Sequence, residues 1–193
     1  MTLKKFKFKK VNSTNDLAIR LIRNKKCTKG IIISEYQKKG RGQHGNKWIS
    51  LKGNLFATVF FDLENVNLSI KKLSIINANL VIKLLSKYSN GNFKLKFPND
   101  ILANKKKICG ILQEVIEVNK IKYMIVGIGL NLIKKPDIKK YPTTSLFDLT
   151  RKKFDIYKIF NSLKEIYDIF LLDINSVKFN NNLKLSKKYI IHS

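Results

Sequence analysis

The feature that most constrains the fold is the segment 106–133, in which two long apolar runs are separated by only two residues. KKICGILQEVIEV occupies 106–118 and IKYMIVGIGLNLI occupies 121–133. Both runs are rich in β-branched residues, which favour strands, and Asn119-Lys120 has the length of a β-hairpin connection. We therefore predict a pair of antiparallel strands here, which a purely parallel sheet does not contain.

The other predicted elements do not alternate strictly between strand and helix. Apolar periodicity predicts strands at 4–11, 30–36, 54–63 and 93–97 and helices at 12–22, 68–88 and 156–174, with 180–193 as a weaker helix or strand. This order predicts an α/β fold of the α+β type, in which helices pack on a mixed sheet. It argues against a doubly wound nucleotide-binding fold.

The strong positive charge has to be weighed against the classes of partner that it suggests. The chain of 193 residues has a formal net charge of +26, and the excess is almost entirely lysine, spread from end to end. A nucleic-acid-binding surface usually clusters its charge and uses arginine, of which this chain has only four. We therefore interpret the charge as a solvated surface and expect no specific nucleic-acid partner.

Cysteine usage and hydropathy indicate the compartment. Cys27 and Cys109 lie far apart, without a CxxC or a His/Cys cluster, which predicts neither a zinc site nor a disulfide framework. The N-terminal decapeptide lacks the apolar region of a signal peptide, and the apolar run 124–133 is too short to span a bilayer. With 44% hydrophobic residues, the chain is expected to form one soluble, cytoplasmic domain with no membrane partner.

The glycine-rich segment KKGRGQHGNKWIS at 38–50 is a candidate anion-binding loop. It lacks the GK[ST] of a P-loop, and it does not open a helix, because Trp48 and a further strand follow. Its glycines let backbone N–H groups approach an anion, and Arg41 adds a guanidinium. Taken alone, however, the segment is better explained as a solvated loop.

The segment FPNDILANKKKICGIL at 97–112 places polar groups among apolar ones. Pro98 ends a strand and presents Asp100, and Lys107 follows seven residues later, with Gly110 just beyond it in the next strand. These residues form either a ligand-binding constellation or a turn with solvated charges.

Two further polar positions are open to two interpretations. Asn131 lies within an apolar run, where a buried amide needs partners, either the backbone or a ligand. The segment NSTN at 12–15 either caps a helix through Ser13 or Thr14, or also forms the rim of a ligand site.

The order of these motifs is more informative than any one of them. S-T-N precedes a helix, Y-Q ends a strand, and then follow G-R-G-x-x-G-x-x-W, N-L, P-N-D-I, the lysine seven residues after the aspartate, G-I-L and G-I-G-x-N. This series, which covers roughly residues 8–150, resembles the catalytic domain of biotin–protein ligases.

The resemblance implies a mixed sheet with helices on one face, as in class II aminoacyl-tRNA synthetases and lipoate ligases. It implies that ATP with Mg²⁺ activates biotin to biotinyl-5′-AMP, and that biotin is then transferred to one lysine of the biotin carboxyl carrier protein of acetyl-CoA carboxylase. It further implies a single catalytic domain over 1–193, without a DNA-binding winged helix or a small C-terminal barrel. It leaves the choice between a monomer and a homodimer open.

The resemblance also assigns roles by position. Arg41 and Lys107 would offset the repulsion between the biotin carboxylate and the α-phosphate, while Asp100 would orient or deprotonate the carrier lysine. Biotin would be bound by Ser13, Thr14, Asn15, Gln37, Lys107 and Gly110. The nucleotide and the adenylate would be bound by Gly40, Arg41, Gly42, Gln43, Trp48 and Asn131. No side-chain cluster for a metal is predicted; Mg²⁺ would arrive with ATP, and Asp100 is its one candidate ligand.

Two positions depart from the family pattern. Gln43 stands where many members have an arginine that helps to retain the adenylate, and Phe97 stands where tryptophan is common. Two alternative functions remain. A lipoate or octanoate ligase would share the fold and a site lysine but not the G-R-G-x-x-G-x-x-W and P-N-D-I motifs, and a basic nucleic-acid-binding module would need a recognisable reading element.

Overall fold

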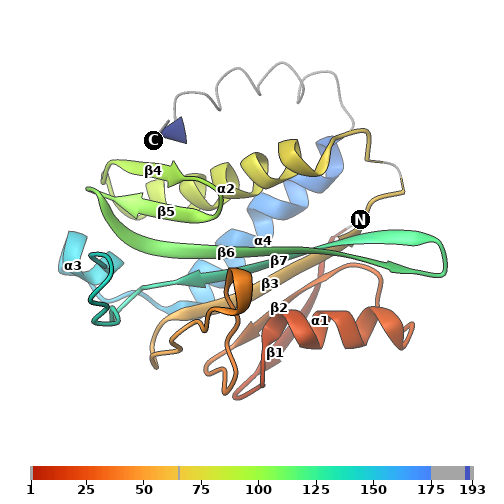
Figure 1. Ribbon diagram of the computed structural model, residues 1–193, viewed down its shortest axis with the longest axis horizontal. Helices are drawn as coiled ribbons and strands as arrows, with labels where there is room; N and C mark the ends of the chain where they lie inside the picture. The colour runs from red at the N-terminus through yellow and green to blue at the C-terminus, as the bar shows by residue number, and fades with distance from the viewer. Residues whose placement is uncertain (1, 65, 175–189, 192–193) are drawn as a thin grey trace.

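The computed structural model describes residues 2–64, 66–174 and 190–191, which form one mixed β-sheet covered by helices (Figure 1). The strands are β1 (Lys4–Phe8), β2 (Gly30–Ser34), β3 (Leu55–Asp62), β4 (Phe93–Lys96), β5 (Asp100–Ala103), β6 (Lys106–Val118), β7 (Ile121–Leu130) and β8 (Ile190–Ile191). Their spatial order is β1-β2-β3-β7-β6-β5-β4-β8. Only β1–β2 and β4–β8 pair in parallel, so the predicted mixed sheet is confirmed.

The predicted hairpin is confirmed and lies near the middle of the sheet. Strands β6 and β7 pair from Val118↔Ile121 to Cys109↔Leu130. Asn119 and Lys120 both have positive φ angles, 52° and 66°, which a tight two-residue hairpin turn requires.

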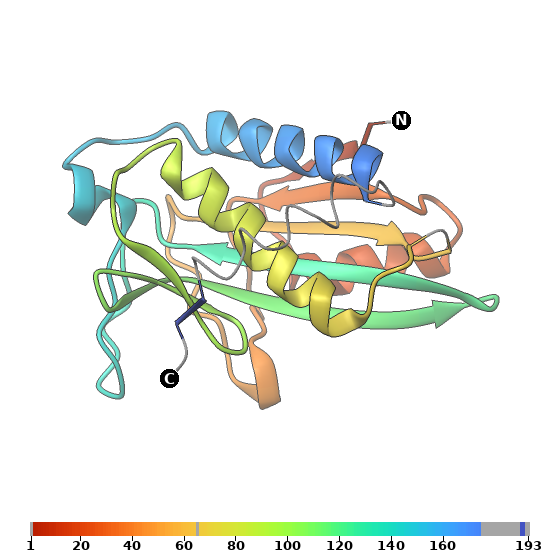
Figure 2. The same cartoon turned by 90° about the horizontal axis from the view of Figure 1, so that it is seen from above.

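The helices cover both faces of the sheet, as the view in Figure 2 shows. They are α1 (Thr14–Arg23), α2 (Ile70–Ser86), α3 (Leu146–Thr150) and α4 (Ile156–Asp173). The expected placement on one face applies to α2 and α4, whereas α1 lies on the opposite face. The alternation along β2 explains this arrangement, because Ile31 and Ile33 face the core under α2 and α4 while Ile32 faces α1.

Several details differ from the sequence-based expectations. The residues after Pro98 form the short strand β5, which turns back through Asn104-Lys105 into β6, and α3 was not predicted. Asn131 lies just beyond the end of β7 rather than inside it. Of the weaker element predicted at 180–193, only β8 belongs to the described residues. Among these residues, no helix is long and apolar enough to cross a membrane.

Candidate active site

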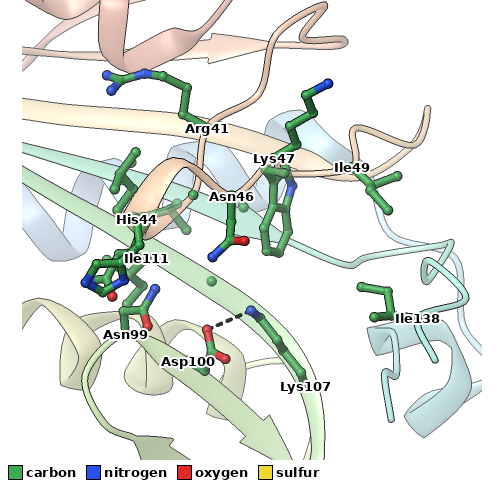
Figure 3. A pocket seen from close by; sticks show the side chains of 18 of the residues that line it. Arg41, His44, Asn46, Lys47, Ile49, Asn99, Asp100, Lys107, Ile111 and Ile138 are labelled. Carbon is green, nitrogen blue, oxygen red and sulfur yellow. Dashed lines mark ion pairs between the residues drawn. The ribbon is translucent and has the colours of Figure 1, made fainter. Parts of the chain in front are cut away.

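A pocket of about 710 Å³ opens over strands β6 and β7 (Figure 3). Three segments with predicted roles meet there: the start of α1, the loop after Gln37 and the segment 98–110. The fourth contributor, the glycines at the end of β7, belongs to the G-I-G-x-N motif but had no predicted role of its own. A fifth segment, 137–141, completes the wall and was not predicted. Most of the predicted site residues therefore lie around one cavity, although they are distributed over more than a hundred positions of the chain.

The floor of the pocket is a pair of glycines beneath a single indole ring. Gly110 and Gly129 face each other across β6 and β7. A Cβ atom at Gly110 would lie 2.6 Å from Trp48 Cζ3, and one at Gly129 would lie 2.3 Å from Trp48 Cε2. The absence of both side chains therefore lets the ring rest on the backbone. The indole Nε1 is buried without a hydrogen-bond partner, which makes it a donor available to a ligand.

Lys107 and Asp100 form an ion pair in the pocket, with 2.7 Å between Nζ and Oδ1 (Figure 3). Asp100 begins β5 and pairs with Gly110 across the sheet. The Lys107 ammonium lies 5.6 Å from the centre of the Trp48 ring and 5.0 Å from that of Tyr141. Asp100, Lys107 and Gly110 therefore lie together, as predicted. The partly buried Lys107 ammonium lies near two aromatic rings, where it could bind an anion.

The start of α1 caps the helix and lines the pocket at the same time. Ser13 Oγ accepts a hydrogen bond from Asp16 N at 3.3 Å. Thr14 N and Thr14 Oγ1 both donate to Gln37 Oε1, at 2.9 and 3.0 Å. The two interpretations of residues 12–15 are therefore compatible, because the cap itself forms the closed end of the cavity.

Asn15 connects this end of the pocket to the sheet. Its Oδ1 accepts from Thr58 Oγ1 at 2.7 Å, and its Nδ2 donates to Leu112 O at 3.2 Å and to Glu114 Oε2 at 2.8 Å. The side chain lies over Gly127, where a Cβ atom would be 2.3 Å from Asn15 Oδ1. The sequence did not point to Thr58 or Glu114, because neither belongs to a recognisable motif.

The loop 40–47 folds back on itself above the pocket. Gly42 N donates to Asn46 O at 2.7 Å, and Trp48 N donates to Gly40 O at 3.0 Å. At the tip, His44 has a φ of 52°, in the left-handed region. Gly40 is not among the residues that line the pocket; a Cβ atom there would lie 2.7 Å from Trp48 O, so this glycine allows the loop to close.

Arg41 lines the pocket, and its guanidinium is paired with two carboxylates. Its Nη2 is 2.8 Å from Asp16 Oδ1 and 2.7 Å from Glu114 Oε2, and its side chain points away from Lys107 in Figure 3. Burial alone would lower the pKa of Arg41, but hydrogen bonds and charge interactions with Glu114 and Asp16 raise it above its ordinary value. In the ligand-free protein the charge of the guanidinium is therefore balanced by two carboxylates.

Asn131 contacts the backbone rather than the pocket. Its Nδ2 donates to Thr144 O at 3.0 Å, and it borders a much smaller cavity beside Trp48 and Lys107. Asn54, which belongs to the N-L motif but was given no role, accepts three successive backbone N–H groups through Oδ1, those of residues 132, 133 and 134, each at 3.1 Å. Together the two asparagines fasten the segment 132–144, which carries Tyr141.

Comparison with known proteins identifies relatives of this chain. The sequence model of the biotin/lipoate A/B protein ligase family matches residues 7–131. The bifunctional ligase/repressor BirA of Escherichia coli is 32% identical over 102 residues, which cover 52% of this chain and 32% of the relative. The biotin–[acetyl-CoA-carboxylase] ligase of Paracoccus denitrificans is 30% identical over 131 residues, which cover 66% of this chain and 54% of the relative. The chain thus spans between about a third and a half of these curated relatives.

Solved structures agree in fold. Biotin protein ligase from Aquifex aeolicus in complex with biotin and ATP superposes with a TM-score of 0.82 at 24% identity, over 97% of this chain and 78% of that one. The Leishmania major biotin protein ligase in complex with biotinyl-5-AMP gives a TM-score of 0.79 at 22% identity, over 98% of this chain and 84% of that one. At these identities the comparison shows a shared fold.

Proposed function

The chain belongs to the biotin/lipoate A/B protein ligase family, and from this membership we propose that it activates biotin with ATP and transfers it to a carrier-protein lysine. The carrier would be the biotin carboxyl carrier protein of acetyl-CoA carboxylase, as the name of the Paracoccus denitrificans relative suggests. The observation that carries the proposal is the convergence of the motifs on one pocket, with the Lys107–Asp100 pair and Trp48 in its wall.

The proposed first step joins biotin to AMP. A carboxylate oxygen of biotin attacks the α-phosphorus of ATP, an O–P bond forms, and the bond to pyrophosphate breaks. Two anions must approach each other, and the Lys107 ammonium would stabilise the charge that develops between them. Gly42 and Gln43 would close over the product, because an acyl-adenylate hydrolyses when water reaches it.

The proposed second step transfers the biotinyl group. The ε-amine of the carrier lysine attacks the acyl carbon, a C–N bond forms, and the C–O bond to AMP breaks. The attacking amine must be neutral and must lose a proton. Asp100 lies at the wall of the pocket, where its carboxylate would accept that proton or hold the amine in line.

The closed end of the pocket suits the head of biotin. Ser13, Thr14, Asn15 and Gln37 present hydroxyl, amide and backbone groups there. A neutral ureido ring both donates and accepts hydrogen bonds, so it matches such a lining. Gly110 would leave its backbone accessible to the ureido ring, and Trp48 would help to enclose the nucleotide side of the pocket.

Mg²⁺ would enter as part of the nucleotide substrate. The described residues contain no group of three or more His, Cys, Asp or Glu side chains that could hold an ion. Mg²⁺ commonly binds through substrate phosphates and one or two carboxylates, and Asp100 is the strand-end carboxylate that could assist. The residues present fit an ion that is carried by ATP rather than one resident in the protein.

The activation step can be tested alone, by biotin-dependent exchange of labelled pyrophosphate into ATP. We expect exchange with biotin and none with lipoate or octanoate, and we expect Lys107→Ala to abolish it. Exchange driven by lipoate or octanoate but not by biotin would favour the alternative ligase on the same fold. No exchange with any of the three acids would overturn the proposed activation step.

A further inference from the structure

Glu114 is a carboxylate that the proposed reaction does not use, yet it connects two parts of the site. Its Oε2 accepts from Arg41 Nη2 at 2.7 Å and from Asn15 Nδ2 at 2.8 Å. Arg41 belongs to the loop 40–47, whereas Asn15 belongs to the closed end of the pocket. A single oxygen thus joins the loop above the cavity to the wall at its end.

We propose that Glu114 is a positioning residue which, together with Asp16, clasps Arg41 and thereby keeps the loop 40–47 folded over the pocket before a ligand binds. Arg41 is then a loop-positioning residue rather than a contact for the α-phosphate. The clasp itself is a property of the ligand-free protein; only its effect on the retention of an intermediate rests on the proposed function.

The loop depends on this clasp because its other hydrogen bonds are internal. Gly42 N bonds to Asn46 O, and Asn46 N bonds to Gln43 O, so these bonds shape the tip without attaching it to the sheet. Within the part of the chain that the structure describes, Arg41 is the only residue of 41–47 whose side chain makes a hydrogen bond or ion pair. Loss of that attachment would free the loop to pivot about its base at Gly40 and Trp48.

The two carboxylates reinforce each other. Asp16 is in the first turn of α1 and Glu114 is on β6, so Arg41 Nη2 bridges two elements that flank the pocket. The side chains are partly exposed, 38% for Arg41 and 24% for Glu114, and a single pair of this kind changes an equilibrium by at most about fivefold. Removal of the Glu114 charge should therefore raise the population of the open loop by up to about fivefold, with a smaller effect for Asp16.

The residue at position 43 increases the importance of the clasp. Position 43 holds a neutral glutamine, and Arg41 is the only arginine between positions 24 and 150. The loop consequently has one guanidinium with which to hold itself closed. If the proposed reaction proceeds here, a looser loop would release more of the activated acid into solution.

Hydrogen exchange of the ligand-free protein tests the clasp. We expect Glu114→Gln, which keeps an acceptor for Asn15 but loses the charge, to raise amide exchange in 40–47 by up to about fivefold. Asp16→Asn should raise it less, and the matched control Glu117→Gln, an exposed carboxylate on the same strand, should leave it unchanged. The double variant Glu114→Gln/Arg41→Gln should exchange like Arg41→Gln alone, because both changes break the same contact.

Three results would overturn the proposal. The first is unchanged exchange in 40–47 for both Glu114→Gln and Asp16→Asn. The second is faster exchange throughout β6 and β7 together with a lower melting temperature, which would make Glu114 an ordinary structural residue. The third is additive effects in the double variant. Since no biotin or ATP is present, these outcomes are independent of whether the ligase activity is found.

Discussion

The contact between Trp48 and Gly129 offers the sharpest test of the pocket floor, through the substitution Gly129→Ala. The added methyl group would lie 2.3 Å from Trp48 Cε2 and 2.7 Å from Nε1, whereas ordinary contact begins at 3.4 Å. The indole would have to withdraw by about 1.1 Å. Overpacking of this kind costs about 1–3 kcal/mol. Because the same ring is proposed to enclose the nucleotide side of the pocket, we expect ATP affinity to fall about ten- to a hundredfold.

Tryptophan fluorescence can follow this change, because Trp48 is the only tryptophan of the chain. Its intrinsic emission therefore reports on this ring alone. We expect a red-shifted emission for Gly129→Ala in the ligand-free protein and a weaker response in an ATP titration. Gly91→Ala is the matched control, because its new Cβ would also make a tight contact, 3.1 Å from Phe93 Cζ, but not with Trp48, so the emission should stay that of the wild type. If Gly129→Ala retained both wild-type emission and wild-type ATP affinity, the floor would not be where Trp48 rests.

Three other predictions concern chemistry in and beside the pocket. Lys107→Ala should slow biotin-dependent pyrophosphate exchange by about a hundredfold or more, whereas Asp100→Asn should spare exchange and slow transfer to the carrier; equal effects on both steps would contradict the separate roles. Gln43→Arg should reduce the release of free biotinyl-5′-AMP, and equal release from both proteins would count against the retention argument. Burial raises the pKa of the Cys109 thiol far above its ordinary value, so its reactive thiolate is suppressed. A thiol reagent at pH 8 should therefore modify only Cys27 until the protein unfolds, and rapid modification of two thiols in the native protein would disprove this.

The sequence was most informative where function restricts the residue type at a fixed spacing. One short segment contains Pro98, Asp100, Lys107 and Gly110, so their proximity in space could be expected from the sequence. The long hairpin of β6 and β7 was also predictable, because each strand has a long β-branched run. Both features depend on local pattern, which a single sequence displays.

Contacts between distant elements could not be predicted in this way. Arg41 and Glu114 are 73 positions apart, and nothing in the sequence distinguishes Glu114 from Glu117 on the same strand. Strand β5 has only four residues, too few for an alternating pattern to stand out. The placement of α1 opposite α2 and α4 depends on which face of the sheet each strand residue occupies, and this is decided by tertiary packing.

The proposed function requires that biotin be activated in this pocket and then transferred to a carrier lysine. The most direct measurement combines the purified protein with biotin, MgATP and a biotin carboxyl carrier domain and follows the intact mass of the carrier. We expect a gain of one biotinyl group that requires both biotin and ATP, is detected by avidin, and is lost with Lys107→Ala. A carrier that stays unmodified, together with no biotin-dependent pyrophosphate exchange, would contradict it.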